Sequence, residues 1–142
     1  MLKTTEFIDK LRSSGLRPTK QRLKICEVLF NREKTFHFTI NDLAKNISDQ
    51  LNEKISLATV YNTVHAFKNK GYLKEISINS DKSYFDTNIT NHHHFFDEDT
   101  NKLIDCNNED IEEIRIKKNI TEKKIKSVEV LIKVASDNQN QN

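Results

Sequence analysis

The spacing of apolar residues predicts three helices within the first fifty residues. A short helix carrying Phe7 and Leu11 ends near Gly15, because glycine suits the left-handed conformation that closes a helix. Pro18 opens a second helix, since proline fits the first helical turn. A third helix begins at Thr39, and its apolar residues recur with the helical period of about 3.6 residues: Ile40, Leu43, Ala44, Ile47 and Leu51.

A fourth helix is predicted from Ser56, a residue type that caps helix N-termini, to Gly71. Its apolar face is expected to be buried: Leu57, Val60, Val64 and Phe67. Its opposite face is polar and carries no negative charge: Thr59, Tyr61, Asn62, His65, Lys68 and Asn69. A helical face without acids indicates a surface that contacts a polyanion, and an ordinary solvated face is the alternative.

The hydrophobic pattern changes after Gly71. Residues 72–78 and 83–87 surround a turn at residues 79–82, which predicts a β-hairpin. Helices followed by a hairpin indicate a winged helix, in which the third and fourth helices form a helix-turn-helix and the fourth fits the major groove of DNA. We therefore predict an N-terminal winged helix-turn-helix DNA-binding domain in residues 1–87.

The second half of the chain predicts a smaller α/β unit. We expect strands at residues 92–97 and 102–106, a helix at about 109–118, and a strand over 128–134, where apolar and polar residues alternate. A unit of this size is too small to form a stable hydrophobic core alone. Residues 88–136 are therefore predicted to be a dimerisation and sensing domain that completes its sheet with a second copy. The fold class is then α+β, and the polar residues 137–142 predict a disordered tail.

Charge supports this division of the chain. The 142 residues have a net charge of only +2, but residues 1–71 hold 13 Lys and Arg against 7 Asp and Glu, and the remainder holds 10 against 14. A basic half beside an acidic half fits a protein whose first half faces nucleic acid. No apolar run is long enough to span a membrane and no signal-peptide core is present, so we expect a cytoplasmic protein without a membrane partner.

Three consecutive histidines, His92, His93 and His94, are the main candidates for site chemistry. In a strand, alternation places His92 and His94 on one face, about 7 Å apart, and His93 on the other. Histidine and carboxylate donors favour zinc, iron or manganese over calcium. Further donors are His37, Asp86, Asp97, Glu98, Asp99 and Asp105. A solvated histidine cluster and imidazole ligation of haem iron by His92, His93 and His94 are the alternatives.

Four segments of the chain resemble the ferric uptake regulator family. They are GLRPTKQRLKICEVL (15–29), ISLATVYNTVHAFKNKGYL (55–73), KSYFD (82–86) and the histidine run. Within the family, HFTINDLAKNI, ATVYNTVHAF and FDTNITNHHHFFDEDTNKLID look most like the iron response regulator branch. The resemblance implies a homodimeric repressor of iron-homeostasis genes that responds to haem or to a divalent metal ion. A zinc- or manganese-sensing regulator of the same family is the alternative.

The resemblance and the charge pattern assign DNA contacts to Arg17, Lys20, Arg22, Thr59, Tyr61, Asn62 and Lys68. Arg17 matches a family residue that reaches into an AT-rich minor groove, and Tyr61 matches the tyrosine of the recognition helix. Many relatives have arginine in place of Asn62. Arg17, Lys20, Arg22 and Lys68 are expected to contact phosphates. Two reading helices in a dimer imply an AT-rich, pseudo-palindromic operator.

The sensory metal site of the family, which joins its two domains, maps onto His37, Asp86, His92 or His94, and Asp105. A second family site needs a histidine after His94, and this sequence has none. With only Cys26 and Cys106, the chain cannot form a four-cysteine zinc site, and it also lacks the N-terminal Cys-Pro haem motif. A small metalloenzyme is the remaining alternative, but no phosphate loop or paired nucleophile supports it, so we expect no enzymatic activity.

Overall fold

The computed structural model describes residues 2–137 and divides the chain into two compact units, residues 1–89 and 90–142. The domain boundary was predicted after residue 87, and the contacts divide the chain between Ile89 and Thr90. The predicted disordered tail, residues 137–142, lies outside the described residues apart from Asp137.

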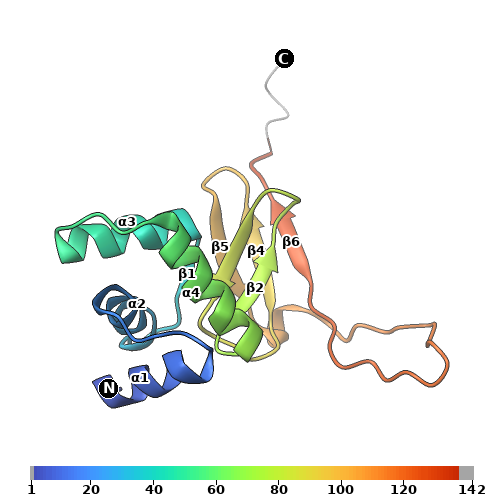
Figure 1. Cartoon of the computed structure of the whole chain (residues 1–142). Coiled ribbons are helices and arrows are strands. Elements are labelled where there is room, and N and C mark those ends of the chain that lie inside the picture. The colour runs from blue at the N-terminus through green and yellow to red at the C-terminus, as the bar shows by residue number, and fades with distance from the viewer. Residues whose placement is uncertain (1, 138–142) are drawn as a thin grey trace. The chain divides into compact units, whose positions relative to one another are not determined.

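Four helices make up most of the first unit (Figure 1). They are α1 (Thr4–Ser13), α2 (Lys20–Phe30), α3 (Ile40–Leu51) and α4 (Leu57–Lys70), which confirms the four predicted helices. Each of the last three begins after a hydroxyl residue that accepts a backbone N–H: Thr19, Thr39 and Ser56. Gly71 ends α4 with a φ of +90°, a left-handed conformation that glycine adopts without steric cost. No helix in the described part of the chain is long and apolar enough to cross a membrane.

The apolar faces of these helices enclose the core of the first unit. Val60, Val64 and Phe67 of α4 are fully buried, as predicted. The prediction that Leu57 is buried is wrong, because its side chain is 53% exposed. Leu57 is the first residue of α4 and lies almost one turn before Val60, where the helix first meets the core.

A three-stranded antiparallel sheet completes the first unit. Its strands are β1 (His37–Phe38), β2 (Lys74–Ser77) and β3 (Ser83–Asp86), in the order β1-β3-β2. The β2–β3 pair is the predicted hairpin, and the helices followed by this hairpin form the expected winged helix. The strand β1 was not predicted, since two residues are too short to show a period. Its pairing places His37 opposite Asp86.

The second unit contains another three-stranded sheet. Its strands are β4 (His93–Asp97), β5 (Lys102–Cys106) and β6 (Leu131–Val134), in the order β5-β4-β6. The β4–β5 pair is antiparallel and sets His94 opposite Asp105, whereas β4 and β6 run parallel. The three predicted strands are present, although β6 begins later than residue 128.

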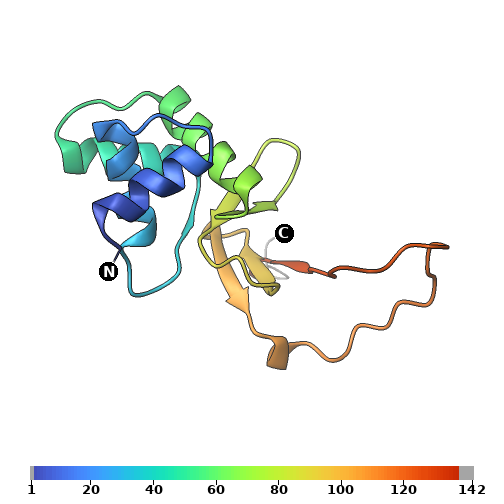
Figure 2. The ribbon, with the colours of Figure 1, turned by 60° about the horizontal axis from the view of Figure 1, so that its bottom comes forward.

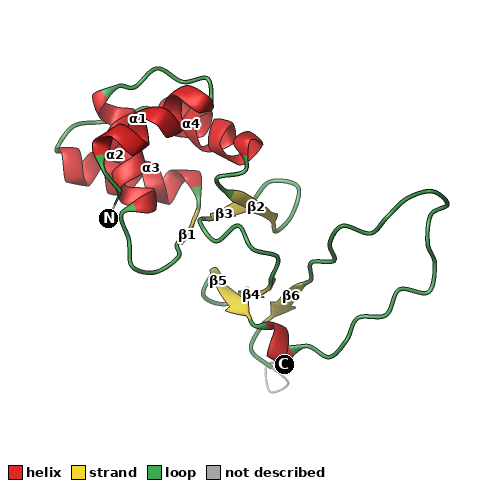
Figure 3. Cartoon of the chain, turned by 90° about the horizontal axis from the view of Figure 1, so that it is seen from below, coloured by secondary structure: helices red, strands yellow, loops and turns green. Residues whose placement is uncertain are grey.

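The predicted helix at residues 109–118 is wrong. Only a single 3-10 turn, η1 (Asn108–Asp110), forms there, and Figures 2 and 3 show residues 111–130 as a long loop. A helix of about ten residues is marginal in water unless one face packs against other elements. In the single chain this loop lacks such packing, since Ile114, Ile116, Ile120 and Ile125 are exposed.

Candidate metal centre and nucleic-acid interface

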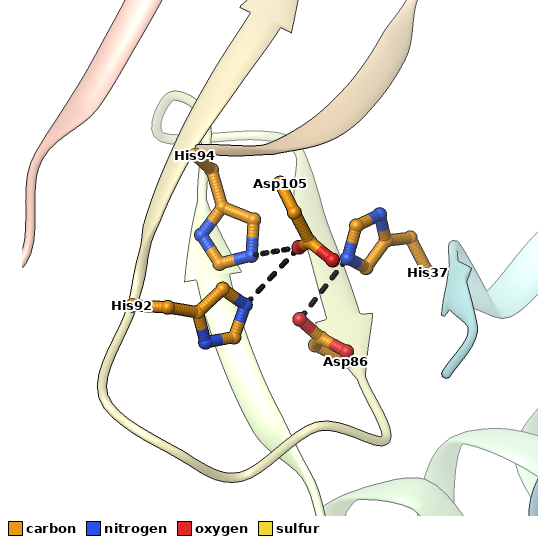
Figure 4. Close-up of side chains that lie close together, drawn as sticks. All are labelled: His37, Asp86, His92, His94 and Asp105. Atoms are coloured by element: carbon orange, nitrogen blue, oxygen red, sulfur yellow. Dashed lines mark hydrogen bonds and ion pairs between the residues drawn. The ribbon is translucent and has the colours of Figure 1, made fainter. Parts of the chain in front are cut away.

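Five side chains carry the candidate metal-ligand atoms: His37 and Asp86 in the first unit, and His92, His94 and Asp105 in the second (Figure 4). These are the residues that the family resemblance predicts for the sensory metal site. All of them offer nitrogen or carboxylate oxygen, the donors that suit zinc, iron and manganese.

In the first unit, the pairing of β1 with β3 brings His37 and Asp86 together. The Nε2 atom of His37 lies 3.1 Å from Oδ2 of Asp86. Asp86 is fully buried, and its Oδ1 accepts the backbone N–H of Asn88 at 2.8 Å. A buried carboxylate must be balanced by a cation or by hydrogen bonds, so this position suits a metal ion or a protonated imidazole.

In the second unit, His92 and His94 approach the same carboxylate oxygen. The Nε2 atoms of the two rings lie 3.1 Å and 3.4 Å from Oδ1 of Asp105 (Figure 4). The prediction that His92 and His94 share a face is confirmed. Backbone geometry alone gives about 7 Å between alternate residues of a strand. The two rings lean together, and their centroids are only 4.3 Å apart.

A backbone carbonyl selects the tautomer of a neutral His92. Its Nδ1 lies 2.7 Å from the carbonyl oxygen of Thr90, and only a protonated Nδ1 can donate to that acceptor. A neutral His92 therefore carries a lone pair on Nε2, directed at the carboxylate of Asp105. Two electron-rich atoms at this distance require a cation between them or a second proton on the ring. The donor set thus fits a metal ion, with Thr90 orienting the ligand.

The middle histidine faces away from this group. The Nδ1 atom of His93 accepts the backbone N–H of Val130 at 2.9 Å, which ties the segment before β6 to β4. Of its two ring nitrogens, Nε2 is the one left for an iron ligand. The three consecutive histidines therefore do not act as one group, and His92 and His94 belong together.

The polar face of α4 presents the predicted base-reading side chains. Tyr61 is 52% exposed and Asn62 is exposed as well. Thr59 is half-buried, and its hydroxyl lies 2.8 Å from the hydroxyl of Ser56, so it is partly committed to the start of the helix. The ring of Tyr61 packs 4.1 Å from that of His65, measured between centroids.

Two of the predicted phosphate contacts are engaged within the protein. The Nζ atom of Lys68 lies 2.8 Å from a carboxylate oxygen of Glu75, and this hydrogen bond lowers the pKa of Glu75. Arg22 is half-buried and donates from Nη1 to the carbonyl of Arg17 at 2.9 Å. Arg17 itself is exposed, and Lys20 reaches Glu53 only at 4.0 Å. Arg17 and Lys20 are therefore the more available cations.

Three partners of these site residues were not predicted from the sequence. The carbonyl of Thr90 and the backbone of Val130 left no signal, since any residue type supplies them. Glu75 did leave a sequence signal. It follows Lys68 by seven residues, and the turn at Gly71 between them brings β2 back beside the end of α4.

The ferric uptake regulator family model matches residues 13–135 of the chain. The chain is 33% identical over 109 residues to the peroxide-responsive repressor PerR of Staphylococcus epidermidis, covering 77% of this chain and 71% of that protein. It is 34% identical to the protein of the same name from Staphylococcus aureus strain Mu50, with coverage of 77% and 72%.

Solved structures show the same fold. The ferric uptake regulator of Vibrio cholerae matches with a TM-score of 0.66 and 23% identity, over 91% of this chain and 98% of that one. A zinc-bound manganese uptake regulator matches with a TM-score of 0.64 and 23% identity, over 94% and 99%. At these identities the structures inform on the fold alone.

Proposed function

Because this chain belongs to the ferric uptake regulator family, whose members are metal-responsive transcriptional regulators and not enzymes, we propose that it is a dimeric, iron-responsive repressor. It binds operator DNA through α4 and responds to a metal ion held by histidine and aspartate. The observation that carries the proposal is the arrangement at Asp105, where two imidazole Nε2 atoms converge on one carboxylate oxygen.

One divalent metal ion is proposed to be held by both sets of ligands. His37 and Asp86 supply two donors, and His92, His94 and Asp105 supply three. A closed zinc site takes four protein donors and iron or manganese takes up to six, so neither set fills a coordination sphere alone. When bound, the ion supplies positive charge that neutralises the buried carboxylate of Asp86 and fixes one arrangement of the two units. Occupancy then alters DNA affinity, because it favours one state of an existing equilibrium.

The sensed signal is proposed to be iron status, as the segments that look most like the iron response regulator branch imply, whereas the relatives found by sequence comparison are peroxide-responsive repressors. A ferrous ion fits the nitrogen and oxygen donors, and zinc or manganese is the alternative of the same donor chemistry. Haem bound by His92, His93 or His94 is the other candidate, with haem expected to weaken DNA binding. The occupied Nδ1 of His93 and the approach of Asp105 to His92 and His94 favour the metal ion.

DNA recognition is proposed to divide between base reading and phosphate contacts. Tyr61 and Asn62 read base edges in the major groove, with Thr59 beside them on the same face of α4. Arg17 enters an AT-rich minor groove, whose narrow width attracts arginine. The remaining affinity comes from Lys20 and, more weakly, from Arg22 and Lys68, which already have partners within the protein. The operator is AT-rich and pseudo-palindromic, matching a two-fold symmetric dimer.

The dimer is proposed to form through the second unit. In the described part of this unit, β5 and β6 each pair with β4 alone, so both are edge strands. Exposed apolar side chains lie on β5 and on the loop after it: Ile104, Ile114, Ile116, Ile120 and Ile125. Edge strands beside exposed apolar residues form a surface that a second copy can cover.

The metal proposal is tested by calorimetric titration of the anaerobically purified, metal-free protein with Fe²⁺, Mn²⁺ or Zn²⁺. We expect one ion per chain. His37→Ala and His94→Ala, which alter different units, should each weaken that same binding event by tenfold or more, as removal of a metal ligand does. His93→Ala is the matched control, because it removes a neighbouring imidazole on the opposite face. Two independent binding events, each sensitive to only one variant, would contradict a shared ion.

The DNA and haem proposals are tested with the same proteins. Gel shifts at low salt with AT-rich palindromes, with and without metal or haemin, should show metal-dependent binding to palindromic duplexes over random ones. An intense haem absorption band that disappears when residues 92–94 become alanine would replace the metal ion with haem as the signal. A dimeric protein that binds no duplex in any state would refute the DNA-binding function.

A further inference from the structure

The two metal-ligand candidates of the first unit are each next to a buried aromatic ring. Phe38 follows His37 in β1, and Phe85 precedes Asp86 in β3. Both rings are almost fully buried, and they stack with centroids 5.8 Å apart and planes inclined by 25°. A change in the backbone of β1 or β3 at the ligands therefore acts directly on this aromatic pair, because a close-packed interior transmits displacement rather than absorbing it.

Two further rings, both from α4, extend this aromatic pair to the exposed face of that helix. The imidazole of His65 meets Phe85 edge-on, with centroids 5.5 Å apart and an interplanar angle of 81°. One helical turn earlier, the ring of Tyr61 lies 4.1 Å from His65. Residues at positions i and i+4 of a helix lie on the same face, so the ring of His65 packs directly against the inner side of the Tyr61 ring.

Burial decreases along this series of rings. Phe85 is 2% exposed, His65 is half-buried and Tyr61 is 52% exposed. The side chain expected to touch DNA is therefore held on one side by a ring that is itself packed against the core. His65 is a polar residue on the face predicted to contact DNA, yet its ring packs against the rings of Tyr61 and Phe85.

We propose that His65 is a positioning residue: it sets the ring of Tyr61 and couples metal occupancy at His37 and Asp86 to this base-reading side chain. The inference rests on the proposed function and adds a route of coupling inside the first unit, from the sheet through Phe85 to α4. This route needs no rearrangement of the two units.

The sequence allows a direct optical test. The chain has no tryptophan and three tyrosines, so Tyr72→Phe with Tyr84→Phe leaves Tyr61 as the single emitting residue. Zn²⁺ is the probe, since its closed shell does not quench emission by unpaired electrons. Tyrosine emission and its anisotropy are followed during a zinc titration of the DNA-free protein, and calorimetry measures zinc binding in parallel.

Four proteins on this background separate the outcomes: the background itself, His65→Ala, His65→Phe and the control Asn69→Ala, which alters an exposed polar residue one turn further along α4. We expect zinc to change the Tyr61 signal in the background and in Asn69→Ala. His65→Ala should reduce the change at least threefold with zinc affinity unchanged within about twofold, and His65→Phe should restore it, because an aromatic pair of this kind is worth roughly a two- to tenfold effect. On operator duplexes, the ratio of Kd without and with zinc should follow the same order.

An equal zinc response in His65→Ala and in the background would overturn the proposal, as would a background that binds zinc without any change at Tyr61. If His65→Ala loses its helical circular dichroism, His65→Leu, which keeps the volume without the ring, is measured instead. A protein that binds no duplex would refute the DNA function, whereas the emission result on free protein still decides the role of His65. A background protein that binds neither zinc nor Fe²⁺ or Mn²⁺ in calorimetry would overturn the metal site and this coupling together, whereas one that binds only Fe²⁺ or Mn²⁺ would overturn the coupling to zinc alone.

Discussion

The ammonium group of Lys68 lies 2.8 Å from a carboxylate oxygen of Glu75, so a lysine on the predicted DNA-binding face is already paired across the turn at Gly71. Its contribution to phosphate binding is therefore limited by competition with Glu75. The exposed fraction of the Lys68 side chain is 40%, which leaves the group accessible to DNA once the partner is removed.

Glu75→Gln should strengthen binding to every duplex by a few fold, because it frees Lys68 for a phosphate. The plot of log Kd against log salt should steepen by about 0.9, the value for one added phosphate contact. Lys68→Ala should weaken binding to all duplexes alike and should reduce the slope of this plot by less than the value for one phosphate contact. Asn62→Ala is the contrasting variant, since it should change base preference while leaving the salt dependence intact. Fluorescence anisotropy at several salt concentrations measures all three, and an unchanged slope in Glu75→Gln would contradict the competition.

The same pair predicts a dependence of stability on acid. The hydrogen bond from Lys68 lowers the pKa of Glu75 below its ordinary value of 4.5. A carboxyl with a lowered folded pKa stabilises the fold above its unfolded pKa and loses this effect as the pH falls through the folded pKa. Urea unfolding of the parent, each single variant (Glu75→Gln and Lys68→Ala) and the double variant should give a coupling of about 0.5 kcal/mol at pH 7, typical of a partly exposed pair. The coupling should vanish well below pH 4.5, and a coupling that persists there would argue against an ionic origin.

The exposure of Leu57 predicts that apolar residues at the start and in the middle of α4 differ in their effect on stability. Val64→Ala should reduce the free energy of unfolding by about 2 kcal/mol, since Val64 is fully buried and its truncation leaves a cavity. Leu57→Ser should change it by no more than about 0.5 kcal/mol, as for other exposed positions. Urea denaturation followed by circular dichroism compares them, and a large loss in Leu57→Ser would place that side chain in the core.

Both cysteines should resist thiol reagents in the folded protein. Burial raises the pKa of Cys26 to about 12, and burial also raises the pKa of Cys106. At pH 8 Cys26 is then almost entirely in the unreactive thiol form. A disulfide-exchange reagent added at pH 8 should label neither residue until urea unfolds the chain, and mass spectrometry identifies the sites. Fast labelling of Cys26 without urea would mean that the core of the first unit opens readily.

The helices of the first unit could be predicted because each has a local cause. Thr19, Thr39 and Ser56 cap helices that then bury a regular apolar stripe, and Gly71 ends α4. The burial of Leu57 was predicted wrongly because the apolar period extends to the first residue of α4, whereas the core does not reach that residue. The sequence carries the period but not the extent of the surface that α4 packs against.

The second unit was predicted less well, since its structure depends on non-local contacts. The alternation of residues 92–97 correctly placed His92 and His94 on one face. The helix expected at 109–118 depended on tertiary packing that a single chain does not supply. The residues of the candidate metal centre could be named from the family resemblance, but the orientation of His92 by Thr90 depends on a backbone carbonyl and has no sequence signature.

The parallel pairing of β4 with β6 has a consequence for how the protein matures during synthesis. The two strands are separated by β5 and by the long stretch of residues 107–130, so their ladder closes a large loop and forms slowly. Residues 1–89 leave the ribosome complete with their own core and can fold at once. The strand β6 emerges after every other strand and helix of the described chain, so the hydrogen bond from Val130 to His93 is among the later contacts to form. A nascent chain therefore completes the polar face of α4 before the sheet that carries His94 and Asp105, so under the proposed function a chain that ends before β6 would bind DNA without responding to metal.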